Sequence, residues 1–277
     1  MSQTPTHDFG KAGRNLKAAT LVGVSLIGAL LISLFVVEQL YPALVAVAMV
    51  FAVHELMHAT VKGASQRLIY AAQFSAIAIV VAAATGDLTT IIATFVGAAL
   101  VVMGIRLFDG QEAYVHHITR TIFVLLYVPL LASFSVLLWA SDNGAWKVLT
   151  FVLLTAGADL GGYFAGIFFG KHPMAPRISP KKTWEGLAGA LALQAIVGAI
   201  LFPAVLDLKV VQGIGVAIIM TLTAVAGDLI ESMIKRDLGI KDMGSLLPGH
   251  GGVMDRLDAL LINAFVAWVV FAVVLVA

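Results

Sequence analysis

The sequence predicts an all-α protein, a polytopic transmembrane bundle of about nine helices with its amino terminus in the cytoplasm. Of the 277 residues, 60% are hydrophobic and only 12% are charged, whereas soluble domains carry roughly 25% charged residues. Apolar runs of roughly 20 residues, enough to cross a bilayer as a helix, recur along the chain. The Lys and Arg residues also fall mostly on one side of the resulting pattern of spans.

The spans are predicted from apolar runs that lie between charged or Gly/Pro-rich breaks. Their approximate bounds are 18–37, 40–61, 68–86, 88–105, 119–140, 146–169, 186–206, 210–233 and 253–277. The first run follows a polar segment with Lys11, Arg14 and Lys17, as in a signal peptide, but it is too long for one. We therefore expect it to remain as a span. The sequence has no internal repeat of the kind that builds many transporters.

The orientation rests on the positive-inside rule. With the amino terminus in the cytoplasm, all 17 Lys and Arg residues except Lys147 and Lys209 lie on or near the cytoplasmic side. The opposite side is marked by acidic residues, namely Glu38, Asp87, Asp142 and Asp207. The most polar cytoplasmic connections are 171–185 and 235–252, and we expect function there. A net charge of +1 gives no sign of nucleic-acid binding, and the lack of cysteine excludes disulfides and Cys-ligated zinc.

Carboxylates inside spans indicate function, because an ionised Asp in the bilayer is costly unless it is paired, hydrated or bound to a cation. Asp159 and Asp228 are such residues. Asp228 shares a helical face with Glu231, Ser232 and Lys235, and Asp255 and Asp258 open the last span. An oxygen-rich cluster of this kind suits Mg²⁺. A belt of ion pairs at the membrane surface explains the same spacing equally well.

The stretch SMIKRDLGIKDMGSLLPGHGGVMDRLD resembles the signature of phosphatidate cytidylyltransferases, also called CDP-diacylglycerol synthases. Its matching positions are Ser232, Lys235, Arg236, Lys241, Asp242, Pro248, His250, Gly251, Gly252, Asp255, Arg256 and Asp258. A second stretch, ADLGGYFAGIFFGKHPMAPRISPKKTWEG from Ala158 to Gly186, is also similar to the family. Ile167 departs from the pattern, which has a basic residue there. The resemblance covers roughly the last 100 residues.

The resemblance implies an enzyme that transfers the cytidylyl group of CTP to phosphatidic acid, giving CDP-diacylglycerol and pyrophosphate for phospholipid biosynthesis. It implies Mg²⁺ as cofactor, with a second monovalent or divalent cation left open. Catalytic roles fall to Asp228, Lys235, Arg236, Asp255 and Asp258, with Asp228, Asp255 and Asp258 as metal ligands. Substrate binding falls to Asp159, Ser179, Lys181, Lys182, Thr183, Lys241, Asp242, His250, Gly251, Gly252 and Arg256.

The predicted spans, the positive-inside rule and the resemblance together suggest an organisation and a location for the chain. We expect a cytoplasmic segment 1–17, amino-terminal helices 18–145 and a catalytic region 146–277 with cytoplasmic loops 170–185 and 234–252. The partners are then CTP, phosphatidic acid and the lipid bilayer, with no nucleic acid and with a homodimer left open. The expected location is the inner (plasma) membrane, with the active site on the cytoplasmic side.

Three local features carry smaller expectations. The glycines of LPGHGG permit positive φ and close backbone approach, so amides at the start of the last helix can face a phosphate. Ser179 or Thr183 is expected to cap the following helix, and Trp184 to lie at the headgroup level. The small residues between Gly186 and Gly198 predict close helix packing.

The segment HELMH, residues 54–58, matches the HExxH pattern of zinc proteases. An intramembrane zinc protease is therefore an alternative, although short matches of this kind arise easily by chance. We favour a hydrogen-bonded polar patch formed by His54, Glu55 and His58 within the bundle. Two further alternatives are a cation-coupled transporter, which leaves the cationic loops unexplained, and a CTP-dependent lipid kinase.

Overall fold

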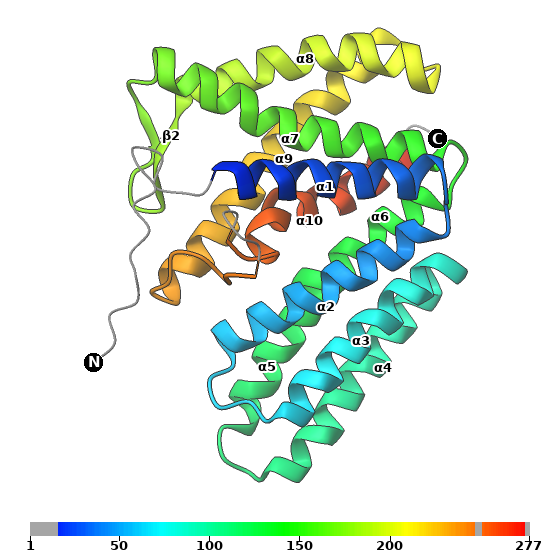
Figure 1. Ribbon diagram of the computed structural model, residues 1–277, viewed down its shortest axis with the longest axis vertical. Coiled ribbons are helices and arrows are strands. Elements are labelled where there is room, and N and C mark those ends of the chain that lie inside the picture. Colours follow the sequence, from blue (N-terminus) through cyan, green and yellow to red (C-terminus); the bar gives the residue numbers. More distant parts are fainter. Residues whose placement is uncertain (1–15, 247–250, 275–277) are drawn as a thin grey trace.

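The computed structural model describes residues 16–246 and 251–274, and it shows a bundle of helices with one small β-hairpin (Figure 1). The α-helices are α1 (Leu16–Phe35), α2 (Leu40–Thr60), α3 (Gln66–Thr85), α4 (Leu88–Arg106), α5 (Tyr114–Leu125), α6 (Leu131–Trp139), α7 (Gly144–Phe169), α8 (Trp184–Leu206), α9 (Val210–Asp237) and α10 (Met254–Val269). Three short helical turns adjoin these helices. The turn η2 (Leu107–Asp109) extends α4, η3 (Leu126–Leu130) joins α5 to α6, and η4 (Val270–Val274) extends α10.

The predicted class, a polytopic helical membrane protein, is confirmed. Seven helical segments of the described chain are long and apolar enough to cross a membrane: Leu40–Thr60, Gln66–Thr85, Leu88–Asp109, Tyr114–Trp139, Gly144–Phe169, Trp184–Leu206 and Val210–Asp237. The first predicted span, 18–37, corresponds to α1, which has 20 residues. The last predicted span, 253–277, begins with α10, which has 16 residues and carries charged side chains in its first turn, and it continues as η4.

The predicted span 119–140 is one helical segment that starts five residues earlier, at Tyr114, and changes geometry midway. Its turn η3 is π-helical and contains Pro129. Proline has no backbone N–H and its ring clashes with the carbonyl one turn before it, so the regular α-helical hydrogen bonding cannot pass through this point.

Small residues bring α7, α8 and α9 together, as predicted. A Cβ atom on Gly186 of α8 would lie 2.9 Å from the carbonyl oxygen of Gly162 in α7. Further along α8, a Cβ atom on Gly198 would overlap the carbonyl of Gly213 in α9. These helices therefore pack backbone to backbone, which larger residues would prevent.

A hairpin that the sequence did not predict lies between α7 and α8. Strands β1 (Pro173–Ala175) and β2 (Ser179–Thr183) pair in antiparallel register. Thr183 ends β2 and caps α8, as expected, by accepting a 3.1 Å hydrogen bond from the amide of Gly186. Glu185 does not complete a capping box, because its carboxylate accepts from the amides of Lys171 and His172 instead.

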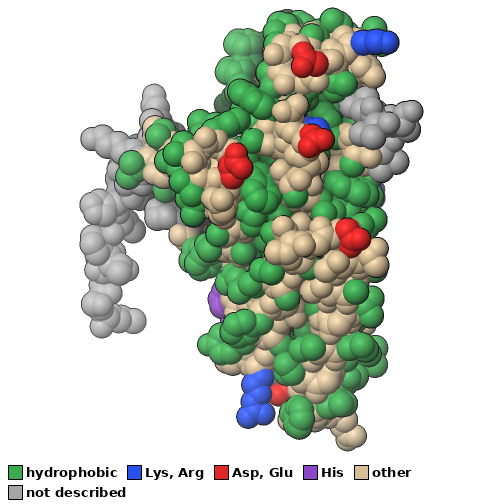
Figure 2. All heavy atoms as spheres, turned by 90° about the vertical axis from the view of Figure 1, so that its right-hand side faces the viewer, with side chains coloured by type: hydrophobic (Ala, Val, Ile, Leu, Met, Phe, Trp, Pro, Cys, Tyr) green, Lys and Arg blue, Asp and Glu red, His purple; other side chains and the backbone are tan. Residues whose placement is uncertain are grey.

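The two ends of the bundle differ in composition. The hairpin, the end of α9 and the start of α10 lie at one end, and the α1–α2, α3–α4, α6–α7 and α8–α9 connections lie at the other (Figure 1). Figure 2 faces this second end, which is mostly hydrophobic or neutral with separate carboxylates and few Lys or Arg side chains. In the α3–α4 connection, Asp87 caps α4, and hydrogen bonds from the Thr90 amide and hydroxyl lower the pKa of Asp87.

Candidate functional site

A cavity of about 380 Å³ lies between α7, the hairpin, α8 and α9. Six of the predicted site residues line it: Asp159 of α7, Ser179, Lys181, Lys182 and Thr183 of β2, and Asp228 of α9. The structure thus brings residues of the stretch 158–186 together with Asp228, which lies four residues before the stretch that begins at Ser232. The cavity combines two carboxylates with two lysines, a composition suited to a phosphorylated ligand and a cation.

An ion pair joins the hairpin to α9 at this cavity. The Lys182 Nζ atom contacts the Asp228 carboxylate, and the two side chains are 21% and 26% exposed. The Ser232 hydroxyl donates to the other Asp228 oxygen at 3.2 Å. One turn further, Arg236 Nε donates to the Ile178 carbonyl in the hairpin at 3.3 Å. The predicted face of α9 therefore holds the hairpin in place.

A second ion pair joins α9 to α10. Lys235 Nζ lies 3.0 Å from Asp255 Oδ1 and 3.4 Å from Glu231 Oε1. Asp255 is buried and also accepts hydrogen bonds from the amides of Met243, at 3.0 and 3.1 Å, and Gly252, at 2.9 Å. Glu231 has no solvent exposure. Sequence analysis placed Glu231 on this face but gave it no role. Its spacing from Asp228 and Lys235 could have indicated that it belongs to the same cluster of charged residues.

The crossing of α9 and α10 places Asp228 and Asp258 near each other. A Cβ atom on Gly227 would lie 3.0 Å from Ala259 Cα and 3.1 Å from the Asp258 carbonyl oxygen. The two backbones therefore touch at the residues that adjoin these two aspartates. Such a close crossing favours glycine at position 227.

The three predicted metal ligands do not form a ready metal centre. Within residues 16–246 and 251–274, no group of three or more His, Asp or Glu side chains is arranged to hold a metal ion. Asp228 and Asp255 are instead neutralised by Lys182 and Lys235. Their oxygen donors nevertheless fit a hard cation such as Mg²⁺ in chemical type.

The loop before α10 confirms one expectation and corrects another. Gly251 has φ +83°, as the glycine-rich segment predicted. The amides of Gly252, Val253 and Met254, however, donate to the carboxylates of Asp255 and Glu55. These three amides are not free to bind a phosphate, because each already donates its hydrogen bond to a carboxylate of the protein.

The other predicted substrate-binding residues lie at the same end of the bundle. Lys241, Asp242 and Arg256 are exposed, and Gly252 is buried. The predicted His250 lies outside the described residues. The exposed cations can reach a ligand that approaches from the aqueous side.

The HELMH segment does not form the predicted polar patch. Glu55 is buried and accepts hydrogen bonds from the start of α10, whereas His54 and His58 are exposed. The two histidine rings lie 4.2 Å apart on the outside of α2. His54 and His58 lie about one helical turn apart, and the three side chains do not meet, because Glu55 faces the core and the histidines face away. The described part of the chain offers no third ligand for a zinc ion.

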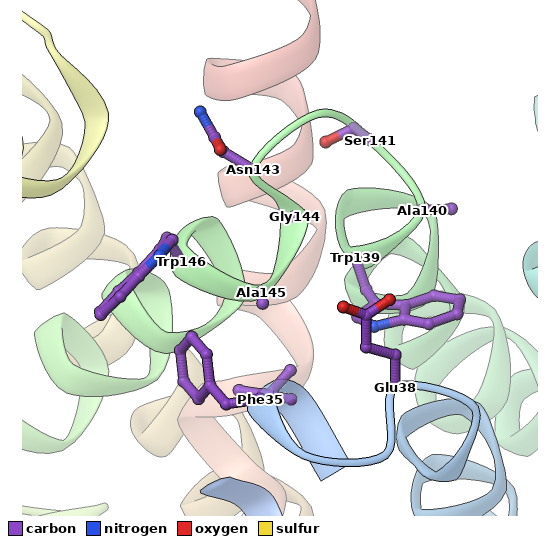
Figure 3. Close-up of a pocket in the computed structure, with 10 residues that line it drawn as sticks. Phe35, Glu38, Trp139, Ala140, Ser141, Asn143, Gly144, Ala145 and Trp146 are labelled. Carbon is purple, nitrogen blue, oxygen red and sulfur yellow. The ribbon is translucent and has the colours of Figure 1, made fainter. Parts of the chain in front are cut away.

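A larger hollow of about 530 Å³ lies at the opposite end of the bundle. Figure 3 shows Glu38 beside Trp139, with Phe35 and Trp146 across the hollow. No Lys or Arg is among the residues that line it. The 380 Å³ cavity has two lysines in its lining and is therefore the better candidate site for a phosphorylated ligand.

The fold and the site define a polytopic membrane protein with a lysine and carboxylate cluster suited to phosphate chemistry. Residues 17–274 match the profile of the cytidylyltransferase family. The chain belongs to this family, and the match extends over both the amino-terminal helices and the signature region.

Relatives from several bacteria carry the name phosphatidate cytidylyltransferase. The Mycobacterium bovis protein is 38% identical over 97% of this chain and 92% of its own length. The Mycobacterium leprae protein is 36% identical over 95% of this chain and 89% of its own length. The Helicobacter pylori protein is 37% identical over 54% of this chain and 55% of its own length. These likenesses give no support to a protease, a transporter or a lipid kinase.

Proposed function

We propose that this chain transfers the cytidylyl group of CTP to phosphatidate in the cavity between α7, the hairpin, α8 and α9. The family and the relatives of nearly full length support the reaction. The observation that supports the location is the pair of salt bridges, Lys182 with Asp228 and Lys235 with Asp255. They bring two lysines beside two carboxylates along α9, the first where β2 contacts α9 and the second where α10 contacts α9.

The reaction needs alignment and charge neutralisation more than a strong base. A phosphate oxygen of phosphatidate, already ionised near neutral pH, forms a bond to the α-phosphorus of CTP. The bond from that phosphorus to the bridging oxygen of the β-phosphate breaks, and pyrophosphate leaves with the electron pair. Holding two polyanions in line is the main barrier, which fixed cations lower.

Lysines at the cavity are suited to this task. Lys181 and Lys182 belong to β2, so the rigid hairpin sets their position. When phosphates enter, Lys182 and Lys235 can exchange a carboxylate for a phosphate oxygen without losing a partner. Arg236 and the exposed Lys241 add positive charge at the same end.

We further propose that Asp228, Asp255 and Asp258 hold Mg²⁺ during turnover. The ion would neutralise charge on the phosphates when bound. The support is the oxygen chemistry of these side chains and the close α9–α10 crossing at Gly227. Asp159, on the α7 side of the cavity, contributes to substrate binding.

The sidedness of the site is also a proposal. The end that carries the hairpin holds most of the cationic residues, which supports a cytoplasmic position by the positive-inside rule. The multi-pass fold places the enzyme in a membrane, and the inner (plasma) membrane of a bacterium fits the bacterial relatives. A homodimer and a second cation remain open predictions.

The position of the label in CTP tests the reaction. Purified protein with phosphatidate, Mg²⁺ and CTP labelled at the α-phosphate should give a labelled CDP-lipid, and His54→Ala should retain most of this product. CTP labelled at the γ-phosphate should leave the lipid unlabelled. A lipid that gains only the γ-label would show a kinase and refute the proposal.

A further inference from the structure

Glu55 of α2 caps a helix that lies 198 residues away in the sequence. Its Oε1 atom accepts a 3.1 Å hydrogen bond from the Val253 amide, and its Oε2 atom accepts a 2.9 Å bond from the Met254 amide. These amides open α10 and have no acceptor within the helix. Val253, at the N-cap position, provides no side-chain cap. Glu55 therefore supplies the cap from another helix.

Two glycines make room for this carboxylate. A Cβ atom on Gly252 would lie 2.5 Å from Glu55 Oε2, and a Cβ atom on Gly244 would overlap Glu55 Oε1. Glu55 is only 8% exposed. The loop before α10 thus closes around the side chain, and a buried charge in this position requires the hydrogen bonds that it receives.

Glu55 and Asp255 divide the amides of this loop between them. Asp255 accepts from Met243 and Gly252, and Glu55 accepts from the next two amides of the chain. Asp255 directly follows Met254, so a rotation of the first turn of α10 would move its carboxylate. The negative charge of Glu55 at the positive end of the helix dipole opposes such a rotation.

We propose that Glu55 is a positioning residue for cytidylyl transfer, which holds Asp255 toward Lys235 by capping α10. It acts through the backbone of Val253 and Met254 and does not contact the substrates. The proposal rests on the proposed function, in which Asp255 belongs to the site. It gives the HELMH segment a role that depends on the glutamate and not on the two exposed histidines.

The test compares Glu55→Gln with His54→Gln in the full-length protein. Glutamine keeps the size of the side chain and one oxygen acceptor, but it turns an N–H group toward one of the two amides. We expect kcat to fall about 10- to 100-fold, the usual range for groups that orient metal ligands. The Mg²⁺ concentration for half-maximal activity should rise, and KM for CTP should change little. His54→Gln should match the wild type in all three.

Hydrogen exchange provides a readout that does not depend on activity. In Glu55→Gln, the amides of Val253 and Met254 should exchange faster, whereas those of α8 should keep their wild-type rates. Wild-type exchange together with wild-type kinetics would overturn the proposal. If the wild type made no CDP-lipid, the proposed function would fail, and the exchange rates alone would still decide whether Glu55 caps α10.

Gly244→Ala is a second variant that should disturb the contact between Glu55 and the start of α10. Gly244 does not have a positive φ, so alanine suits its backbone. Its methyl group would displace the Glu55 carboxylate. Should Glu55→Gln fail to fold, Gly244→Ala must show the same fall in kcat and the same higher Mg²⁺ requirement. A folded Gly244→Ala protein with wild-type kinetics would overturn the proposal.

Discussion

Asp255→Asn removes the charge that joins α9 and α10. The Asp255 and Lys235 side chains are 4% and 16% exposed, so the pair is largely buried. Breaking such a pair by neutralising one partner costs about 3–5 kcal/mol. Glu231 remains 3.4 Å from Lys235 and still neutralises it, so we expect the lower end, about 3 kcal/mol of unfolding free energy. Loss of a fixed charge at the reacting phosphates should lower kcat by about 100- to 1,000-fold.

The assay measures CDP-lipid from labelled CTP in detergent micelles, with thermal denaturation of the same samples as the check on folding. Asp237→Asn is the matched control, because Asp237 is an exposed acidic residue at the end of α9, the helix that carries Lys235. It should leave activity and stability near wild type. A folded Asp255→Asn enzyme that retains more than about a tenth of wild-type kcat would refute the role of this charge, since it would have lost under about 1.4 kcal/mol.

Three further predictions concern the hairpin, the helix crossing and the orientation. Lys182→Gln should raise KM for CTP yet cost less than about 1 kcal/mol in stability, since its pair with Asp228 is partly exposed. An unchanged KM would count against the cavity as the CTP site. Gly227→Ala should lower stability by about 1–3 kcal/mol, measured by thermal denaturation, because its Cβ would press on the α10 backbone. The chain has no cysteine, so single Asp142→Cys and Arg177→Cys variants can report sidedness. A membrane-impermeant maleimide on intact cells should label the first and reach the second only after permeabilisation, and the reverse would invert the proposed orientation.

The sequence was sufficient for the class of fold and for the charged residues around the cavity. Spans are predictable because a helix in lipid must satisfy its backbone hydrogen bonds internally, which leaves a long apolar run as the signal. The face of Asp228, Ser232 and Lys235 followed from helical spacing. The residues that contact this face could not be predicted in the same way. Lys182 reaches Asp228 from a hairpin with strands of three and five residues, and these strands have no strong alternation of apolar and polar residues.

The same limit explains the error over the loop amides. A glycine-rich turn before a helix is a plausible phosphate site by local chemistry alone. Whether its amides are free depends on what else reaches them, and here a residue 198 positions earlier does so. Long-range contacts of this kind are set by helix packing, which a single sequence does not specify.

Glu55 shows how a short motif can be informative for a reason other than its pattern. Read as HExxH, the segment directs attention to two histidines on one helical face. The physical question is different, because a carboxylate buried in a bundle must find donors, and bundles have few that are unpaired. The first amides of a helix are such donors. For Glu55 the donors are the first amides of α10, in the turn that carries Asp255.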